Sequence, residues 1–157
     1  MTTLTIMVGL LVAPLLFGAA LNRFAGRTVA NVHLLGCIGI ALVFGFTGVG
    51  HFILTEPMAE MLPPWVPLRI PLVYVTGVLE IAAAVAVLIP RLRMVVGWGL
   101  IVMLILFLPV NVYAALNRIE MGGHEWGPIY LLVRVPVQCI LIGWTWWFAV
   151  RPSAPKA

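Results

Sequence analysis

Two fully charged side chains stand inside stretches of the sequence that are otherwise apolar. Glu80 lies within residues 70–89 and Arg134 within residues 128–150. A charge at the centre of a lipid bilayer costs about 2.5–3.5 kcal/mol on insertion scales, so neither side chain is expected to face lipid. Ionisable residues inside membrane segments usually mark a functional site. We therefore expect both charges to point into a helix bundle and to belong to a site there.

Helical spacing assigns neighbours to each charge. Small residues share the face of Glu80 and branched residues lie opposite, which predicts that Glu80 occupies an interface between helices. The shared face holds Thr76, Gly77, Ala83 and Ala84, and the opposite face holds Val75, Val78, Val85 and Ile89. Around Arg134, polar groups recur every four residues and form one stripe, made of Tyr130, Arg134 and Gln138.

Prolines and two further polar residues extend this layer. Proline removes a helical hydrogen bond and frees a carbonyl one turn earlier. Pro136 is expected to free the carbonyl of Leu132, and Pro109 that of Ile105 shortly before Asn111. His51 lies near the outer end of its stretch, with Thr47 one turn below.

The depths of these groups agree with a single site. At about 1.5 Å per residue, Glu80 lies roughly 15 Å inside the outer boundary and Arg134 roughly 9 Å. An arginine side chain is long enough to bridge the difference. His51, Asn111 and Arg134 then share the outer half of the bundle, with Glu80 and Gln138 at its floor.

The polar layer has two interpretations. In the first, Glu80 and Arg134 form a buried ion pair that locks the helices, and Asn111 and Gln138 add hydrogen bonds between helices. Such bonds are worth only about 0.6 kcal/mol on average in membranes, so stability alone explains so many of them poorly. In the second, which the sequence favours, the layer is a binding site.

Neither histidines nor cysteines suggest a metal centre. His33 and His51 lie roughly 27 Å apart along one helix, which is unsuitable for haem. His33 lies at an inner helix end and His124 in an outer loop, so both are placed outside the polar layer. Cys37 and Cys139 are isolated in the sequence and form no CxxC pair. We expect no metal, and we interpret the cysteines as apolar packing residues.

The elements that must position these residues follow from composition. Hydrophobic residues make up 63% of the 157 residues and charged residues only 9%, against about 25% charged in soluble domains. A helix needs about 20 apolar residues to cross a bilayer. Five stretches of the sequence meet this requirement, at approximately 4–21, 29–54, 70–89, 95–116 and 128–150. The prediction is a single all-α membrane domain over residues 1–157, with no aqueous catalytic domain.

Charges between the stretches predict the orientation. One side carries only basic residues, namely Arg23, Arg27, Arg91, Arg93, Arg151 and Lys156, whereas the other mixes Arg69 and Arg118 with four glutamates. Basic residues near helix ends stay in the cytoplasm, so the amino terminus is expected outside and the carboxyl terminus inside. This distribution explains the net charge of +4 without nucleic-acid binding. Because no basic residue precedes the first stretch, we interpret it as a retained helix rather than a signal peptide.

The connector 55–69 holds Pro57, Pro63, Pro64 and Pro67 around Trp65. So many prolines are expected to prevent regular helix, and tryptophan suits a membrane interface. Two interpretations stay open. The segment is either a partly inserted cap over the outer mouth of the bundle or an ordinary stiff connector.

The order of several short motifs resembles the DoxX-like family of small membrane proteins. The motifs are Gly48-Val49-Gly50-His51-Phe52, the proline-rich connector, Gly77-Val78-Leu79-Glu80, Phe107-Leu108-Pro109-Val110-Asn111, and the late Arg134 and Gln138. The likeness covers about residues 44–148 and implies a four-helix core to which the first helix is added. A subunit associated with thiosulfate:quinone oxidoreductase belongs to that family, so the resemblance implies a cytoplasmic (inner) membrane protein linked to redox or quinone chemistry. The missing cysteine pair puts direct thiol exchange in doubt.

The leading hypothesis is a pocket for a quinone or another amphiphile in the outer half of the bundle. Arg134 would hold an oxygen or anionic group of the ligand, and His51 or Glu80 would exchange protons. The remaining expected ligand-binding residues are Asn111, Gln138, Tyr130 and Trp65. A non-catalytic accessory subunit of a larger redox or transport complex is the main alternative, and a small-solute carrier is the third. Possible partners are therefore the lipid bilayer, a redox complex or a second copy of the chain.

Overall fold

The computed structural model describes residues 2–25 and 31–151, and every regular element in these residues is helical. Five helices in the described part are long and apolar enough to cross a membrane. They are α1 (Thr2–Ala25), α2 (Val32–Ile53), α4 (Arg69–Ala86), α5 (Arg93–Leu116) and the final span His124–Val150. The final span consists of a 3₁₀ segment η1 (His124–Tyr130), α6 (Leu131–Thr145) and a π-helical turn η2 (Trp146–Val150). The predicted all-α, five-helix membrane architecture is confirmed.

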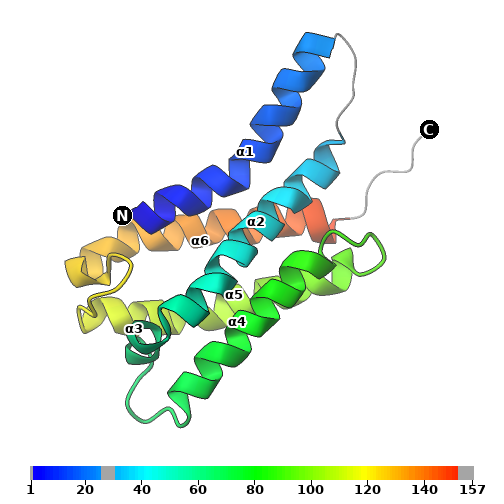
Figure 1. The fold of residues 1–157 in the computed structure, drawn as a ribbon. Coiled ribbons are helices and arrows are strands. Elements are labelled where there is room, and N and C mark those ends of the chain that lie inside the picture. Colours follow the sequence, from blue (N-terminus) through cyan, green and yellow to red (C-terminus); the bar gives the residue numbers. More distant parts are fainter. Residues whose placement is uncertain (1, 26–30, 152–157) are drawn as a thin grey trace.

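The helices lie in two layers (Figure 1). α2 is central in one layer, with α1 packed on one side and α4 on the other, and α5 and α6 pack together across that layer. Figure 1 also shows the end of α1, the turn between α4 and α5, and the end of the final span on one side of the molecule. The basic residues Arg23, Arg91, Arg93 and Arg151 belong to these segments, while Arg27 and Lys156 lie outside the described residues.

Apolar side chains from both layers form a shared core. Its most buried members come from four helices and include Leu11, Ile40, Val43, Leu100 and Leu141. The branched residues Val75, Val78 and Val85 on α4 are exposed, whereas Gly77 and Ala84 are buried. The prediction that the small-residue face of α4 points into the bundle is therefore confirmed.

Glycine permits a close contact between α2 and α4. A Cβ atom built on Gly77 would lie 2.7 Å from the Cβ of His51 and 3.1 Å from the backbone oxygen of Gly48. A Cβ built on Gly48 would lie 3.1 Å from the oxygen of Gly77. No larger residue fits at either position without moving a helix, because contacts this short are repulsive. α4 packs mainly on α2 and only loosely on α5.

Two local predictions differ from the structure. The proline-rich connector was expected to lack regular helix, but it begins with the short helix α3 (Thr55–Glu60). Pro57 is tolerated because it occupies the first turn, where a backbone N–H has no helical partner in any case. The final span was predicted to begin at residue 128, but helical turns start at His124 and bend at Gly127, where φ is 70°.

Candidate functional site

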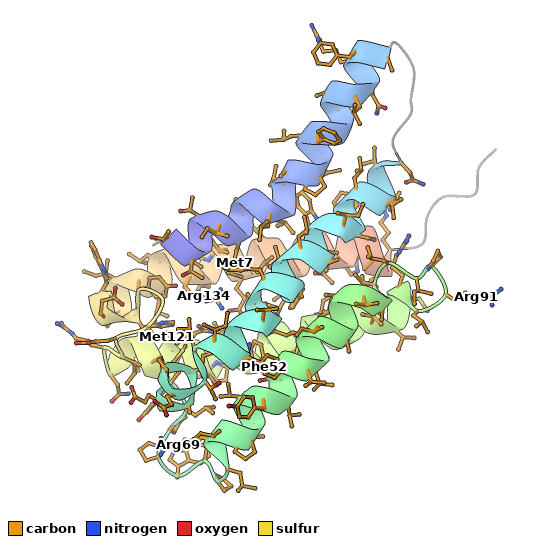
Figure 2. The ribbon with its side chains drawn as sticks, viewed as in Figure 1. Met7, Phe52, Arg69, Arg91, Met121 and Arg134 are labelled. Atoms are coloured by element: carbon orange, nitrogen blue, oxygen red, sulfur yellow. The ribbon has the colours of Figure 1, made fainter. Side chains whose placement is uncertain are left out.

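A cavity of about 810 Å³ lies where α4 and α5 fail to close on each other. Apolar side chains of these two helices form most of its wall, and α1, the end of α2, α3 with the residues just after it, and the start of the final span with the loop before it complete the wall. Polar residues collect towards one end, and they are Thr3, Thr47, His51, Thr76, Glu80, Asn111, His124, Tyr130 and Arg134. Figure 2 shows Arg134 inside the bundle, whereas Arg69 and Arg91 lie at opposite ends of the α4 region. The cavity is thus an apolar slot with a polar end.

The α2–α4 glycine contact positions His51 and Glu80. Each follows its glycine by three residues and so lies on the same helix face, His51 after Gly48 and Glu80 after Gly77. Nδ1 of His51 lies 3.8 Å from Oε2 of Glu80 and donates to the backbone oxygen of Thr47 at 2.9 Å. Glu80 is only 2% exposed, and its Oε2 has no hydrogen-bond partner. The sequence prediction that these two residues share a site is consistent with this geometry.

A second polar group forms around the amide of Asn111. Arg134 donates from Nε to Oδ1 of Asn111 at 3.1 Å, and Nδ2 of Asn111 donates to the backbone oxygen of Phe107 at 2.7 Å. The Nη1 nitrogen of Arg134 is buried without a hydrogen-bond partner. Asn111 therefore fixes the guanidinium by one edge and leaves another nitrogen unpaired.

His124 is the residue that sequence reasoning missed. It was placed in an exposed outer loop, apart from the polar layer, but it is only 3% exposed and its Nε2 lies 3.1 Å from Oδ1 of Asn111. Gly122 and Gly123, with φ of 64° and 111°, turn the chain inwards just before it. The ring packs edge-on against Tyr130 with centroids 4.7 Å apart. The Gly-Gly pair was the available signal, since such pairs mark tight turns.

Glu80 and Arg134 do not form the ion pair that the locking interpretation assumed. Within the described residues, the ion-pair contact of Glu80 is with His51, and none is found with Arg134. Both side chains nevertheless line the same cavity. The depth estimate measured position along the bilayer normal and could not measure the lateral separation of α4 from α6.

Of the other expected site residues, one lines the cavity and two do not. Tyr130 is buried and lines the cavity. Gln138 is buried outside the cavity wall, and its Nε2 donates to the backbone oxygen of Leu104. Leu104 directly precedes Ile105, whose carbonyl Pro109 was expected to free. Trp65 is 81% exposed and takes no part in the wall.

The connector 55–69 contributes to the wall through its first half. Met58 and Met61, in and just after α3, line the cavity, and so does Leu62. The connector therefore covers part of the cavity with methionine and leucine side chains instead of Trp65.

Comparison with known proteins adds a family assignment. Residues 40–149 match a family model described as a domain of unknown function (DUF8561). The chain belongs to the DUF8561 family. The match starts within α2 and runs into the last turn of the final span, so the DUF8561 region contains every polar residue of the cavity except Thr3 and leaves α1 outside. Searches of curated proteins and of solved structures return no match.

The DUF8561 region shows no grouping suited to a metal. Within residues 2–25 and 31–151, no three or more His, Cys, Asp or Glu side chains lie together. Cys37 is buried with Sγ 3.3 Å from the backbone oxygen of Phe148, and Cys139 is exposed, so both are free thiols. The chemistry available to the cavity is therefore that of a guanidinium, two imidazoles, a carboxyl and a phenol.

Proposed function

We propose that this DUF8561 chain is a membrane-embedded binding protein for an amphiphile such as a quinone. The observation that carries the proposal is the cavity of about 810 Å³, apolar along α4 and α5 and polar at one end. Ligand pockets typically occupy about 300–1,000 Å³ and combine apolar walls with a few convergent polar groups. An amphiphile would place its tail between α4 and α5 and its head beside Arg134.

Unpaired polar atoms favour binding over a purely structural role. Oε2 of Glu80 and Nη1 of Arg134 are buried without hydrogen-bond partners. An unsatisfied buried polar group costs about 1–3 kcal/mol, and more when it is charged. If these residues served only to lock helices, they would gain most by contacting each other, and they do not. A ligand head between them would satisfy both.

The proposed roles follow from position. Arg134 holds the head of the ligand, and His51 with Glu80 exchanges protons with it from the opposite wall. The resemblance to DoxX-like proteins supports a redox-associated role and makes a quinone the first candidate. The loop charges support an orientation in the cytoplasmic membrane with the amino terminus outside, and this orientation puts the polar end in the outer half of the bilayer.

Filling the slot tests the proposal. Gly99 lines the cavity, and a Cβ built on it meets no atom within 4 Å, so Gly99→Phe would occupy the slot without a backbone clash. Gly143 is equally open but lies outside the cavity wall, so Gly143→Phe is the matched control. Native mass spectrometry in mild detergent should detect a retained lipid-like molecule on the wild type and on Gly143→Phe, and none on Gly99→Phe.

Two outcomes would reject binding. A wild-type protein that carries nothing, even after incubation with quinone, would favour the accessory-subunit function, and so would equal retention by Gly99→Phe. The identity of a retained molecule is decided by solvent extraction and its absorption spectrum before and after chemical reduction. A reducible chromophore is expected for a quinone. Its absence would exclude a quinone as the retained molecule, while binding of an amphiphile would still stand.

A further inference from the structure

The carbonyl oxygen of the Asn111 side chain has no capacity left for a ligand. Its Nδ2 donates to the oxygen of Phe107, so Oδ1 must be the atom that faces Arg134 and His124. A carbonyl oxygen has two lone pairs, and these two neighbours use both. Oδ1 of Asn111 therefore positions two side chains at the polar end, while Nδ2 has a second N–H beyond the one donated to Phe107.

Both ring nitrogens of His124 face acceptors, and protonation of the ring would satisfy both contacts. Its Nδ1 lies 2.6 Å from the backbone oxygen of Met121, which can only accept, and its Nε2 lies 3.1 Å from Oδ1 of Asn111, which also accepts. Neutral imidazole has one N–H and cannot donate at both positions, whereas the doubly protonated ring donates at both. The orientation of the Asn111 amide is independently determined by its contacts with Phe107 and Arg134.

The charge of Arg134, joined by that of His124 when the ring is protonated, thus lies at Asn111 without a carboxylate in contact. Nη1 of Arg134 is buried and unpaired. The nearby Glu125 is exposed, and its Oε2 accepts from the backbone N–H of Gly123. Glu80 contacts His51 on the opposite wall. A guanidinium nitrogen that is buried without an acceptor is unfavourable, so a negative group is missing from this end of the cavity.

We infer that the ligand supplies this group, so that the molecule bound in the cavity is a single-chain lipid with an oxyanion head, a carboxylate or a phosphate, contacted by Arg134. This inference rests on the proposed function and narrows its ligand class to a head that carries negative charge, which an oxidised quinone lacks. His124 adds positive potential beside the head when its ring is protonated.

The shape of the cavity agrees with a single chain. Its wall follows α5 from Asn111 back to Val96, roughly 22 Å along the helix axis at 1.5 Å per residue. The wall beyond the polar end consists of apolar side chains and glycine from α4 and α5, such as Ala83, Leu100 and Met103. An acyl chain lying in this slot would run across the membrane with its head at Arg134.

The test compares lipids that have the same acyl or alkyl chain length but different head groups, with ubiquinone alongside them. Purified protein in mild detergent is titrated by native mass spectrometry with oleate, oleyl phosphate, methyl oleate and ubiquinone, and inorganic phosphate is added as a competitor. At least one of the two charged lipids should bind roughly ten-fold or more tightly than the ester, as expected for hydrogen bonds to a charged group. Inorganic phosphate should not compete, because it has no tail. Displacement by inorganic phosphate would overturn the lipid assignment.

Variants connect the preference to the named residues. Arg134→Gln should bring oleate affinity down to that of methyl oleate, and Arg134→Lys should retain part of the preference. His124→Gln should weaken the charged lipids without affecting the ester. Arg91→Gln, which removes a positive charge from an exposed residue outside the cavity wall, should change neither. Thermal melts confirm that each variant is folded.

Different results would contradict amphiphile binding and the preference for an oxyanion head. If ester, quinone and oleate bind the wild type equally, amphiphile binding stands and the oxyanion inference is wrong. The inference is also wrong if Arg134→Gln is folded and keeps the full preference. If no amphiphile binds, the proposed function itself fails. The wild-type comparison decides the matter even if Arg134→Gln does not fold.

Discussion

Replacing Gly77 by alanine tests whether the contact between α2 and α4 sets the geometry of the site. The added Cβ would lie 2.7 Å from the Cβ of His51 and 3.1 Å from the backbone oxygen of Gly48. Neither atom can rotate away, because one is the first side-chain atom and the other belongs to the backbone. The two helices must therefore separate, and the 3.8 Å distance between His51 and Glu80 should increase with them.

The size of the effect can be worked out from two opposing contributions. Overpacking a close contact costs about 1–3 kcal/mol, while alanine gains up to about 1 kcal/mol over glycine inside a helix. Gly77→Ala should thus lower the free energy of unfolding by about 0–3 kcal/mol. Gly99→Ala supplies the matched control, since its Cβ meets nothing within 4 Å. It should raise the free energy of unfolding by up to about 1 kcal/mol.

The difference between the two variants, about 1–3 kcal/mol, is the quantity to measure. Unfolding by sodium dodecyl sulfate in mixed micelles, followed by tryptophan fluorescence, provides it for both proteins under the same conditions. The two variants have the same chemical change on helices of the same bundle, so effects of detergent on helix propensity largely cancel. Gly77→Ala equal to or more stable than Gly99→Ala would refute the close contact and the placement of His51 against Glu80.

Three further predictions concern topology, metals and charge coupling. Cysteines placed at Thr3 and Gly122 should react with an impermeant thiol reagent outside intact cells, and one at Pro152 should be protected; labelling at Pro152 would overturn the orientation. Purified protein should contain no stoichiometric zinc, copper or haem by elemental analysis and absorption spectroscopy, and one metal per chain would contradict this. In a double-mutant cycle, Glu80→Gln and Arg134→Met should be nearly additive in stability, with coupling below about 0.5 kcal/mol as for groups not in contact; a coupling of several kcal/mol would restore the ion pair.

The spans could be predicted because their signal is local. A stretch such as 95–116 is identified by its own apolar length, and no information about its neighbours is needed. The same holds for the inward direction of Glu80, which follows from the residues on its own helix face. Arg134 and Tyr130 were also found from spacing within one helix. In the structure Tyr130 is buried and Arg134 is half-buried, as that spacing predicts.

The surroundings of His124, Gln138 and Trp65 were not predicted because they depend on contacts between segments. The inward turn of His124 depends on a Gly-Gly turn and on the ring of Tyr130, and neither has helical periodicity. Gln138 continues the stripe of Arg134, but α5 comes close enough there for its amide to donate to the oxygen of Leu104. Trp65 has the type expected of a cap, yet its connector directs it outwards. Sequence spacing places residues on a helix, whereas the distance to the next helix decides what they contact.

The two sides of α4 show how the chain could combine a stable bundle with an open slot. On the α2 side, Gly48 and Gly77 bring the backbones together, so this side already holds His51 against Glu80. On the α5 side, the helices remain apart around the cavity, and Arg134 across it keeps an unpaired nitrogen. A residue that only stabilised the fold would be expected on the closed side, where partners are within reach. The unpaired guanidinium nitrogen of Arg134 lies instead on the open side, where the proposed ligand would supply its acceptor.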